Sequence, residues 1–298
     1  MTCSVARSML GFTIVLGSGI LASLLFAQRE PSRPSRFEAH MFTDQQIASL
    51  SSKKVFFGHQ SVGNNIINGI RDLAAQDARL NFNIVKSADP QSVSGPALVE
   101  FNIGDNGNPR SKIDAFTAVL DKGMGAQGGI AMFKLCFVDI DSATDIPKLA
   151  AAYRDAIAAL KKKYPLLEIV HVTVPLTAPE PLAKAWVKTL LGRATRLDLN
   201  VKREEFNELL RRAYTGTDPI FDLAQVESTH IGGSRSYFMQ GNQRIYTLAA
   251  EFTADGGHLN EVGRRRAAEQ LLVLLAGMDP TSSSVRRFDS RQPASQLR

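Results

Sequence analysis

Cysteine is nearly absent from this chain. Its 298 residues include only Cys3 and Cys136, and Cys3 lies in the short segment before a long apolar run. We therefore expect no internal disulfide in the main domain, which a domain of this size does not require. Internal repeats are absent as well. Hydrophobic residues make up 44% of the chain, enough for the core of one large domain or two small ones.

Acidic side chains are too few to balance the basic ones, and the formal net charge is +6. The terminal segments hold this surplus, because residues 37–278 are close to neutral. The basic residues of these segments are Arg7, Arg29, Arg33, Arg36, Arg286, Arg287, Arg291 and Arg298. Basic segments of this kind are usually solvated or interact loosely with anionic surfaces. We therefore expect no nucleic-acid partner.

A long apolar run extends from Met9 to Ala27. Its length lies between the apolar part of a signal peptide and a full membrane span. Leu25 departs from the small-residue pattern of a cleavage site, so residues 1–27 are either a signal peptide or an N-terminal membrane anchor. Both alternatives predict export to the periplasm or the extracellular space, with possible membrane association through residues 9–27. Cys3 precedes the run, which disfavours a lipoprotein anchor.

Three further segments follow this run. Residues 28–42 are predicted to be a linker, since they contain prolines and no periodicity. Residues 43–278 are predicted to form one domain. Residues 279–298, rich in serine, glutamine and arginine, are predicted to be a disordered basic tail.

Short apolar runs and amphipathic stretches alternate within the predicted domain. The predicted strands are Lys54–Gly58, Phe82–Lys86, Ala97–Ile103, Gly129–Val138, Glu168–Val174 and Ile220–Leu223. The predicted helices are Thr43–Ser51, a segment around Ile66–Ala74, Ser111–Leu120, Ile146–Lys163, Lys202–Tyr214 and Leu259–Ala276. This alternation predicts an α/β fold, a three-layer α/β/α sandwich with a mainly parallel sheet. Ligands of such sheets bind outside the carboxyl ends of the strands.

A serine follows the first of these strands, in the segment Gly58-His59-Gln60-Ser61-Val62-Gly63. Its hydroxyl would lie near the N-terminus of a helix, where backbone N–H groups stabilise developing negative charge. Glycines on either side permit a tight turn and close approach of a substrate. Ser61 is therefore a candidate nucleophile, and the alternative is that it only caps the helix.

An aspartate and a histidine lie three residues apart near the end of the domain. They belong to Asp255-Gly256-Gly257-His258-Leu259, which leads into the last predicted helix. This spacing lets one short loop present a base together with the carboxylate that orients it. Together with Ser61, these residues would complete the triad of a serine hydrolase.

The two ends of the domain resemble the SGNH (GDSL-like) hydrolase superfamily, as a divergent member. In that superfamily the serine follows the first strand, and Asp and His share a D-x-x-H turn before the last helix. The resemblance covers residues 53–277 and implies a flavodoxin-like, SGNH-type sandwich. It also implies Ser61 as nucleophile, His258 as general base and Asp255 as the residue that orients it.

The activity that this resemblance implies is that of a serine esterase. Its substrate would carry an ester-linked acyl group on a carbohydrate or a lipid. Oxyanion donors would be the Ser61 N–H and a loop glycine, for which Gly104 and Gly107 are candidates. The alternative for these glycines is an ordinary Asn/Gly turn.

The chain departs from the superfamily pattern at two places. The aspartate that usually precedes the serine is replaced by Gln60, and the asparagine that supplies a third oxyanion donor is missing from the segment after the central strand. That segment is Phe133-Lys134-Leu135-Cys136-Phe137-Val138-Asp139. We expect Cys136 to be packed in the sheet and Lys134 or Asp139 to reach the cleft.

His59 has two interpretations. It could line the cleft or bond to Asp139, or it could pack against the sheet as a neutral histidine. His59, Asp255 and His258 could in principle bind a metal, but their spacing matches no dedicated metal motif. We therefore expect neither a metal nor a cofactor.

Two other functions compete with the esterase. A non-catalytic relative that binds glycans or assembles envelope material would explain the missing asparagine. An α/β-hydrolase would explain the match of Ser61 and Gly63 to a nucleophile elbow, although that fold places its serine after several strands. The segment Ser228–Thr247 is predicted to be a substrate-facing insertion. Trp186 lies on a predicted helix and gives no functional signal.

Overall fold

The computed structural model describes residues 28–29, 42–89 and 92–278. The predictions for residues 1–27, for most of 28–42 and for 279–298 lie outside this range. Gln28–Arg29, at the start of the predicted linker, form a short strand, β1. Among the described residues, no helix is both long and apolar enough to span a bilayer.

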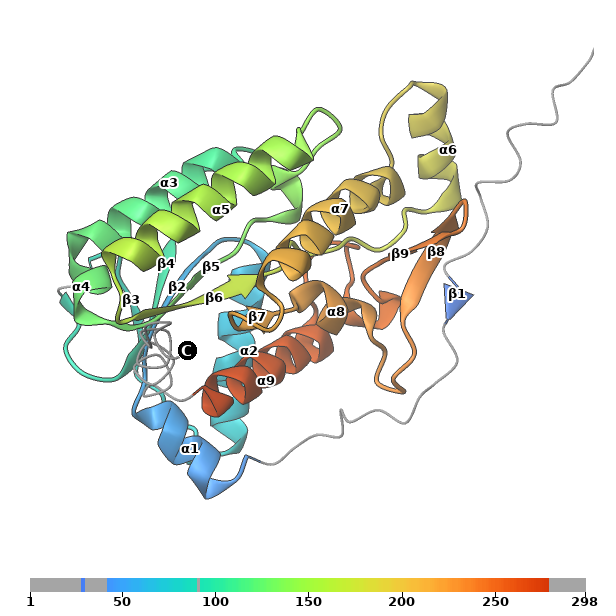
Figure 1. Cartoon of the computed structure of the whole chain (residues 1–298). Helices are drawn as coiled ribbons and strands as arrows, with labels where there is room; N and C mark the ends of the chain where they lie inside the picture. The colour runs from blue at the N-terminus through green and yellow to red at the C-terminus, as the bar shows by residue number, and fades with distance from the viewer. Residues whose placement is uncertain (1–27, 30–41, 90–91, 279–298) are drawn as a thin grey trace, which may run out of the picture.

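The centre of the molecule is a six-stranded sheet in which all paired strands run parallel (Figure 1). From one edge to the other, the strands are β3 (Ile84–Lys86), β4 (Ala97–Asn102), β2 (Lys54–His59), β5 (Gly129–Phe133), β6 (Leu167–Val172) and β7 (Ile220–Phe221). Strand β2 is the first of these in sequence, and it lies between β4 and β5. After β2 the chain forms the edge strand β3, then β4 between β3 and β2, and it then crosses to β5 on the other side of β2. The carboxyl end of β2 is therefore a topological switch point, where open α/β sheets bind ligands.

Helices cover both faces of this sheet (Figure 1). One face carries α1 (Asp44–Ser51), α2 (Val62–Gln76), α8 (Leu223–Ser228) and α9 (Glu261–Gly277). The other carries α3 (Pro109–Val119), α4 (Gly125–Gln127), α5 (Ile146–Lys163) and α7 (Arg196–Tyr214). The predicted three-layer α/β/α sandwich with a parallel sheet is confirmed.

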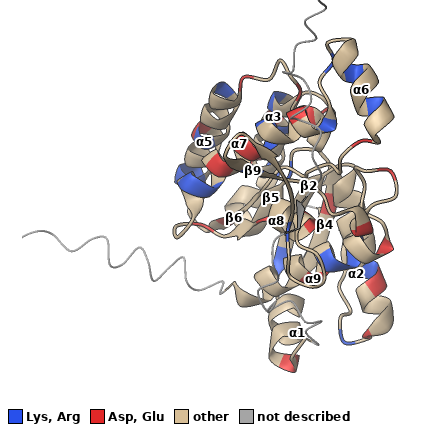
Figure 2. Ribbon diagram, turned by 90° about the vertical axis from the view of Figure 1, so that its right-hand side faces the viewer, with Lys and Arg blue, Asp and Glu red and all other residues tan. Residues whose placement is uncertain are grey.

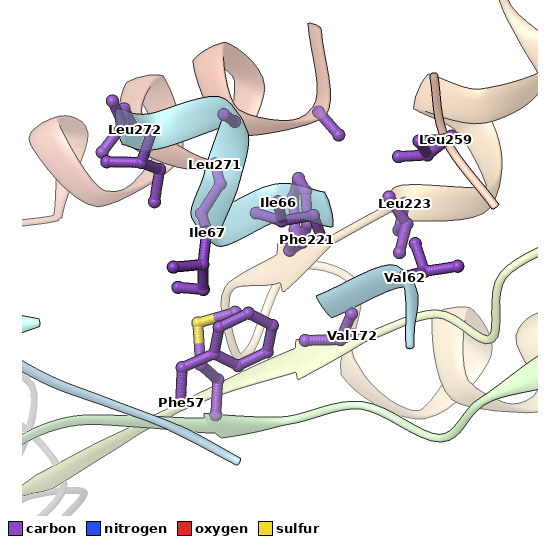
Figure 3. Close-up of a cluster of buried hydrophobic side chains, with 14 of the residues drawn as sticks. Phe57, Val62, Ile66, Ile67, Val172, Phe221, Leu223, Leu259, Leu271 and Leu272 are labelled. Carbon is purple, nitrogen blue, oxygen red and sulfur yellow. The ribbon is translucent and has the colours of Figure 1, made fainter. Parts of the chain in front are cut away.

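Two apolar cores separate the layers, and β2 contributes to both. Successive side chains of a strand point to opposite faces, and both Phe56 and Phe57 are fully buried. Phe57 packs with Ile67 and Leu271 between the sheet and the helices α2 and α9 (Figure 3). Phe56 packs in the second core, beneath α3 and α5. Both faces of β2 are therefore fixed by packing, and the turn that follows it starts from a rigid strand.

Most of the predicted helices and strands are present, but several ends differ. Strand β5 ends at Phe133 instead of Val138, because the Asp139 carboxylate accepts a hydrogen bond from the Cys136 amide and folds Phe137–Asp139 into a 3-10 turn. Helix α7 begins earlier than predicted, since Thr195 forms a capping box with Asp198.

The segment Ser228–Thr247 is a β-hairpin with its own small sheet. Strands β8 (Ser236–Gln240) and β9 (Gln243–Tyr246) pair antiparallel, and β1 pairs with β8. The helix expected around Trp186 is α6 (Leu182–Leu190), which projects from the body near this hairpin (Figure 1).

Candidate active site

The turn from β2 to α2 holds Ser61 in a backbone conformation that L-residues rarely adopt. Its φ is 54° and its ψ is −114°, and it is the only non-glycine residue with a positive φ in the described part of the chain. Conformations of this kind cost about 1–3 kcal/mol and cluster at functional sites. The Ser61 side chain makes no capping hydrogen bond to α2. The alternative that this serine only caps the helix is therefore wrong.

The two glycines of the serine segment provide space. A Cβ on Gly63 would overlap the His59 side chain, and a Cβ on Gly58 would lie 2.8 Å from Ile103. Neither glycine has a positive φ. They allow β2, α2 and the loop after β4 to approach closely around Ser61, while the serine itself carries the strained conformation.

The Asp255 carboxylate organises the second half of the site. Its Oδ1 accepts hydrogen bonds from the amides of Gly257 (2.8 Å) and His258 (2.8 Å), and its Oδ2 lies 2.7 Å from His258 Nδ1. The following amide, of Leu259, donates to Asn65 Oδ1 at 3.2 Å and so ties the turn to α2. One turn thus presents an imidazole and its carboxylate, as the spacing predicts.

These hydrogen bonds keep Asp255 ionised. Partial desolvation raises the pKa of this carboxyl, but the bonds from the His258 amide, the His258 ring and the Gly257 amide lower it by more. The net effect holds the pKa of Asp255 well below its ordinary value. An ionised carboxylate can only accept hydrogen bonds, so His258 Nδ1 is the donor of the pair.

The serine and the histidine turn meet although they are far apart in sequence. Ser61 Oγ lies 2.7 Å from His258 Nε2. Since Nδ1 carries the proton shared with Asp255, Nε2 accepts from the Ser61 hydroxyl. The ring of Phe137 packs edge-on against the imidazole, with the ring centroids 5.6 Å apart. The side chains of Asp255 and His258 are 57% and 47% exposed, so the site opens directly to solvent.

Gln60 connects the serine turn to the loop after β4. Its Nε2 donates to the carbonyl oxygens of Ile103 (2.8 Å) and Gly104 (2.5 Å). Within the described residues, the N–H groups of Ser61 and Gly104 make no hydrogen bond. Both remain candidates to donate to an oxyanion, and Gln60 fixes the distance between their two segments.

Gly107, by contrast, already has an acceptor. Its amide donates to Asp139 Oδ1 at 2.8 Å, and Asp139 Oδ2 accepts from Lys112 Nζ at 2.7 Å. Lys112 also donates to Asn106 Oδ1 at 2.9 Å. The side chains of Asp139 and Lys112 are completely buried. The expectation that Asp139 reaches the cleft is therefore wrong. Both oxygens of its carboxylate accept hydrogen bonds, and these bonds hold the 104–108 loop against the exit of β5.

Lys134 does not reach the cleft either. Its side chain is fully buried, and Nζ donates to the Leu135 carbonyl and the Cys136 sulfur, each at 3.2 Å. Burial lowers the pKa of Lys134. Cys136 is buried as expected, with its thiol 3.6 Å from the Gln60 carbonyl. Neither side chain stands in for the missing asparagine.

His59 packs into the sheet, as one of its two interpretations predicted. It is fully buried, and its Nε2 lies 3.1 Å from Glu100, which also pairs with Arg71. Burial lowers the pKa of His59 more than the Glu100 carboxylate raises it. No cluster of three or more metal-ligating side chains occurs in the described part of the chain. His59 is thus paired with Glu100 in place of Asp139.

Two hollows in the surface, of about 110 and 400 Å³, lie at the amino ends of the strands. They are lined by residues such as Lys53, Ala97 and Gly129, and the triad lies at the opposite edge of the sheet. The chemistry of the triad and its place at the switch point make the carboxyl edge the candidate site.

The residues that support the triad carried no signal in the sequence analysis. In the sequence Gln60 is only a departure from the superfamily pattern, and no motif marks Lys112 or Arg196. Arg196 Nη2 donates to the Asp255 carbonyl at 2.8 Å. Each of these side chains acts across a long separation in sequence, where no local spacing indicates the partner.

Comparisons with known proteins find similarity only to solved structures, at low sequence identity. No protein-family model and no curated protein matches the chain. The lipase/acylhydrolase from Enterococcus faecalis shares 14% identity over 82% of this chain and all of that chain, with a TM-score of 0.41. A GDSL-like lipase from Bacteroides thetaiotaomicron shares 11% sequence identity over 76% of this chain and 86% of that chain, with a TM-score of 0.40. A carbohydrate esterase of family 3 from Talaromyces cellulolyticus shares 13% sequence identity over 76% of this chain and all of that chain, with a TM-score of 0.42. The chain thus shows structural similarity to GDSL-type lipases and esterases at low sequence identity.

Proposed function

We propose that this protein is a serine esterase that hydrolyses an ester-linked acyl group of a carbohydrate or a lipid. One observation carries the proposal. A strained serine at the switch point of the sheet lies 2.7 Å from His258 Nε2, and the same imidazole lies 2.7 Å from an ionised aspartate. This chain of hydrogen bonds is the arrangement that activates a serine hydroxyl for acyl transfer.

The first half of the reaction acylates the serine. Ser61 Oγ attacks the ester carbonyl carbon while His258 Nε2 takes the hydroxyl proton. The negative charge that develops on the carbonyl oxygen is stabilised by the N–H groups of Ser61 and Gly104. The intermediate collapses, the C–O bond to the alcohol breaks, and His258 gives its proton to the departing oxygen.

The second half releases the acid. His258 takes a proton from water, and the resulting hydroxide attacks the acyl carbon. Collapse of this intermediate breaks the bond to Ser61 Oγ, which recovers its proton from His258. Asp255 stays ionised throughout, since it orients the imidazole and stabilises its charged form. The net reaction converts an ester and water into an acid and an alcohol.

The export signal or anchor predicted at residues 1–27 favours a substrate outside the cytoplasm. We therefore place the esterase in the periplasm or the extracellular space. The exposed triad suits an acyl group on a polymer or at a surface, since such a substrate need not enter a deep pocket.

The purified full chain in mild detergent tests the proposal. It should hydrolyse short p-nitrophenyl esters and react with a fluorophosphonate probe, whereas Ser61→Ala and His258→Ala should lose at least about three orders of magnitude in kcat. Ser52→Ala, at the opposite edge of the sheet, is the matched control and should keep full activity. Activity that persists in Ser61→Ala would exclude the serine mechanism.

A non-catalytic ligand-binding protein is the second candidate, and the lack of the third oxyanion donor favours it. Loss of one donor lowers kcat by about 10²–10³ in a related hydrolysis. If neither the ester nor the probe reacts with a folded protein, and an acylated oligosaccharide binds equally to the wild type and Ser61→Ala, this second function holds.

A further inference from the structure

Helix α6 presents an apolar face that the rest of the described chain leaves uncovered. None of its residues is buried. Leu182, Trp186 and Leu190 are 68%, 59% and 69% exposed, and Val187 is 47% exposed. The next residue after the helix, Leu191, is 60% exposed. Single exposed apolar residues are ordinary, but a contiguous set on one helix marks an interaction surface.

The exposed residues share one side of the helix. Leu182, Trp186 and Leu190 are spaced four residues apart, so they lie one above the other. Ala185 and Lys188 face toward the body and are half-buried, and Lys188 forms an ion pair with Glu180. The apolar side chains are therefore open to the surroundings, and α6 itself projects from the body (Figure 1).

The charges of this segment are all positive. Between Pro181 and Thr195 the chain has Lys184, Lys188 and Arg193 and no acidic residue. Figure 2 shows blue bands on α6, the helix that contains Lys184 and Lys188. An amphipathic helix with basic residues beside a Trp- and Leu-rich face lies in the interface of a membrane, and anionic headgroups attract such residues.

Both ends of the α6 segment are attached to the catalytic turn. The Ala178 amide donates to the Gly256 carbonyl at 2.9 Å, before the helix. After the helix, Arg196 Nη2 donates to the Asp255 carbonyl at 2.8 Å, and the Arg196 amide donates to Glu180 Oε2 at 3.0 Å. Residues 179–195 thus form a protruding segment whose two ends both contact the Asp255–His258 turn.

We propose that residues 182–193 dock onto an anionic lipid surface, with the apolar side of α6 in the acyl-chain region and Lys184 and Arg193 against the headgroups. A second copy of the chain is disfavoured as the occupant, because two all-positive segments repel each other. Docking does not depend on esterase activity. If the proposed function holds, the attachment of this segment to the catalytic turn brings Ser61 close to the membrane, and acyl lipids become its substrate class.

The single tryptophan of the chain makes the proposal measurable, because Trp186 lies on the face that would insert. The full chain with Ser61→Ala, which prevents hydrolysis, is mixed with vesicles of phosphatidylcholine with or without phosphatidylglycerol. We expect a blue shift of the emission and quenching by brominated acyl chains with phosphatidylglycerol, and far weaker effects without it. This readout reports the depth of α6 itself, even where residues 9–27 bring the protein to the vesicle.

Three variants give the contrast. Leu182→Ser with Leu190→Ser, and separately Lys184→Glu with Arg193→Glu, should each weaken the quenching-derived vesicle affinity about tenfold. Leu166→Ser, which replaces a leucine of 66% exposure at the opposite edge of the sheet, should leave it unchanged. Unquenched Trp186 in vesicles that bind the protein would overturn the proposal. So would a blue shift that depends on protein concentration without vesicles, or equal quenching in all variants.

Discussion

Ser61 combines a positive φ with a hydroxyl that faces an imidazole. A strained backbone conformation persists only where surrounding contacts hold it in place. Three contacts hold the Ser61 turn. Gly63 packs directly on His59, and Gln60 holds the two carbonyl groups of the neighbouring loop. The strain therefore aims Oγ at His258 in the absence of a substrate, which reduces the reorganisation needed for attack.

Gln60 is a positioning residue by this geometry, and its replacement gives a first residue-scale prediction. Gln60→Leu removes both hydrogen bonds to the Gly104 segment, so the Gly104 N–H should lose its alignment with the oxyanion. We expect kcat on p-nitrophenyl acetate to fall by about 10²-fold with KM little changed, since the bond matters most in the transition state.

The exposed Gln243→Leu on β9 is the matched control for this experiment and should keep the kcat of the wild type. Gln60→Glu, whose carboxylate cannot donate to the two carbonyls, should be as slow as Gln60→Leu. A wild-type kcat in Gln60→Leu would contradict the positioning role.

The triad residues could be predicted from the sequence, because Asp255 and His258 are close in sequence and Ser61 follows a strand. Asp255 and His258 share one turn, and Ser61 lies two residues after the end of an apolar strand. The environment of the triad is not local. Asp139 and His59 have partners in other elements. The sequence therefore predicted Lys134 or Asp139 in the cleft, whereas the structure buries both.

At the scale of elements, a buried ion pair joins the exit of β5 to α3, and the same carboxylate holds the loop after β4. Asp139 accepts from Lys112, from the Cys136 amide and from the Gly107 amide. These bonds satisfy both buried charges and replace the strand pairing that ends at Phe133. The sequence predicted a strand through Val138 because apolar residues continue to that point, and only the carboxylate that folds the chain back ends it.

Breaking this pair should be costly. Asp139→Asn leaves the Lys112 ammonium buried without a counter-charge, and we expect the free energy of unfolding to fall by about 3–5 kcal/mol. Urea denaturation followed by circular dichroism measures it. Asp114→Asn removes an exposed i,i+4 pair with Arg110 and should change stability by less than about 1 kcal/mol. An equal effect of the two variants would show that the buried pair does not hold the loop.

For the whole molecule, alternation of strands and helices was sufficient to predict the sheet, its parallel sense and its two helical layers. Each of these follows from apolar periodicity and from the rule that crossovers cover both faces. The hairpin of β8 and β9 was not predicted. Its strands are short, and only Ser236, Tyr237 and Ile245 are buried in them. A segment so weakly apolar is hard to tell from a loop.

The stability of the whole molecule should depend on pH through Glu227 in α8. This side chain is 1% exposed, and its Oε2 accepts from the Leu176 amide at 2.8 Å. Burial raises the pKa of Glu227 from 4.5 to about 8, although Lys134 and Arg203 oppose the rise. The folded state therefore keeps this proton over a range in which the unfolded chain releases it.

This difference fixes the sign of the pH dependence. Below pH 4.5, both states hold the proton and Glu227 contributes no penalty. Between pH 4.5 and 8 the unfolded state ionises first, so the free energy of unfolding falls as pH rises, by up to about 5 kcal/mol. Above pH 8 the penalty is constant. Glu227→Gln removes the titration, so its stability relative to the wild type should rise through this window and then level off.

Urea denaturation of both proteins at a series of pH values measures this relative stability. Glu261→Gln, at an exposed position of α9, serves as the control and should show no such rise. A constant difference between Glu227→Gln and the wild type from pH 4.5 to 8 would mean that Glu227 is ionised in the folded protein. In that case Lys134, whose ammonium would then be charged as well, compensates it within the core beneath the triad.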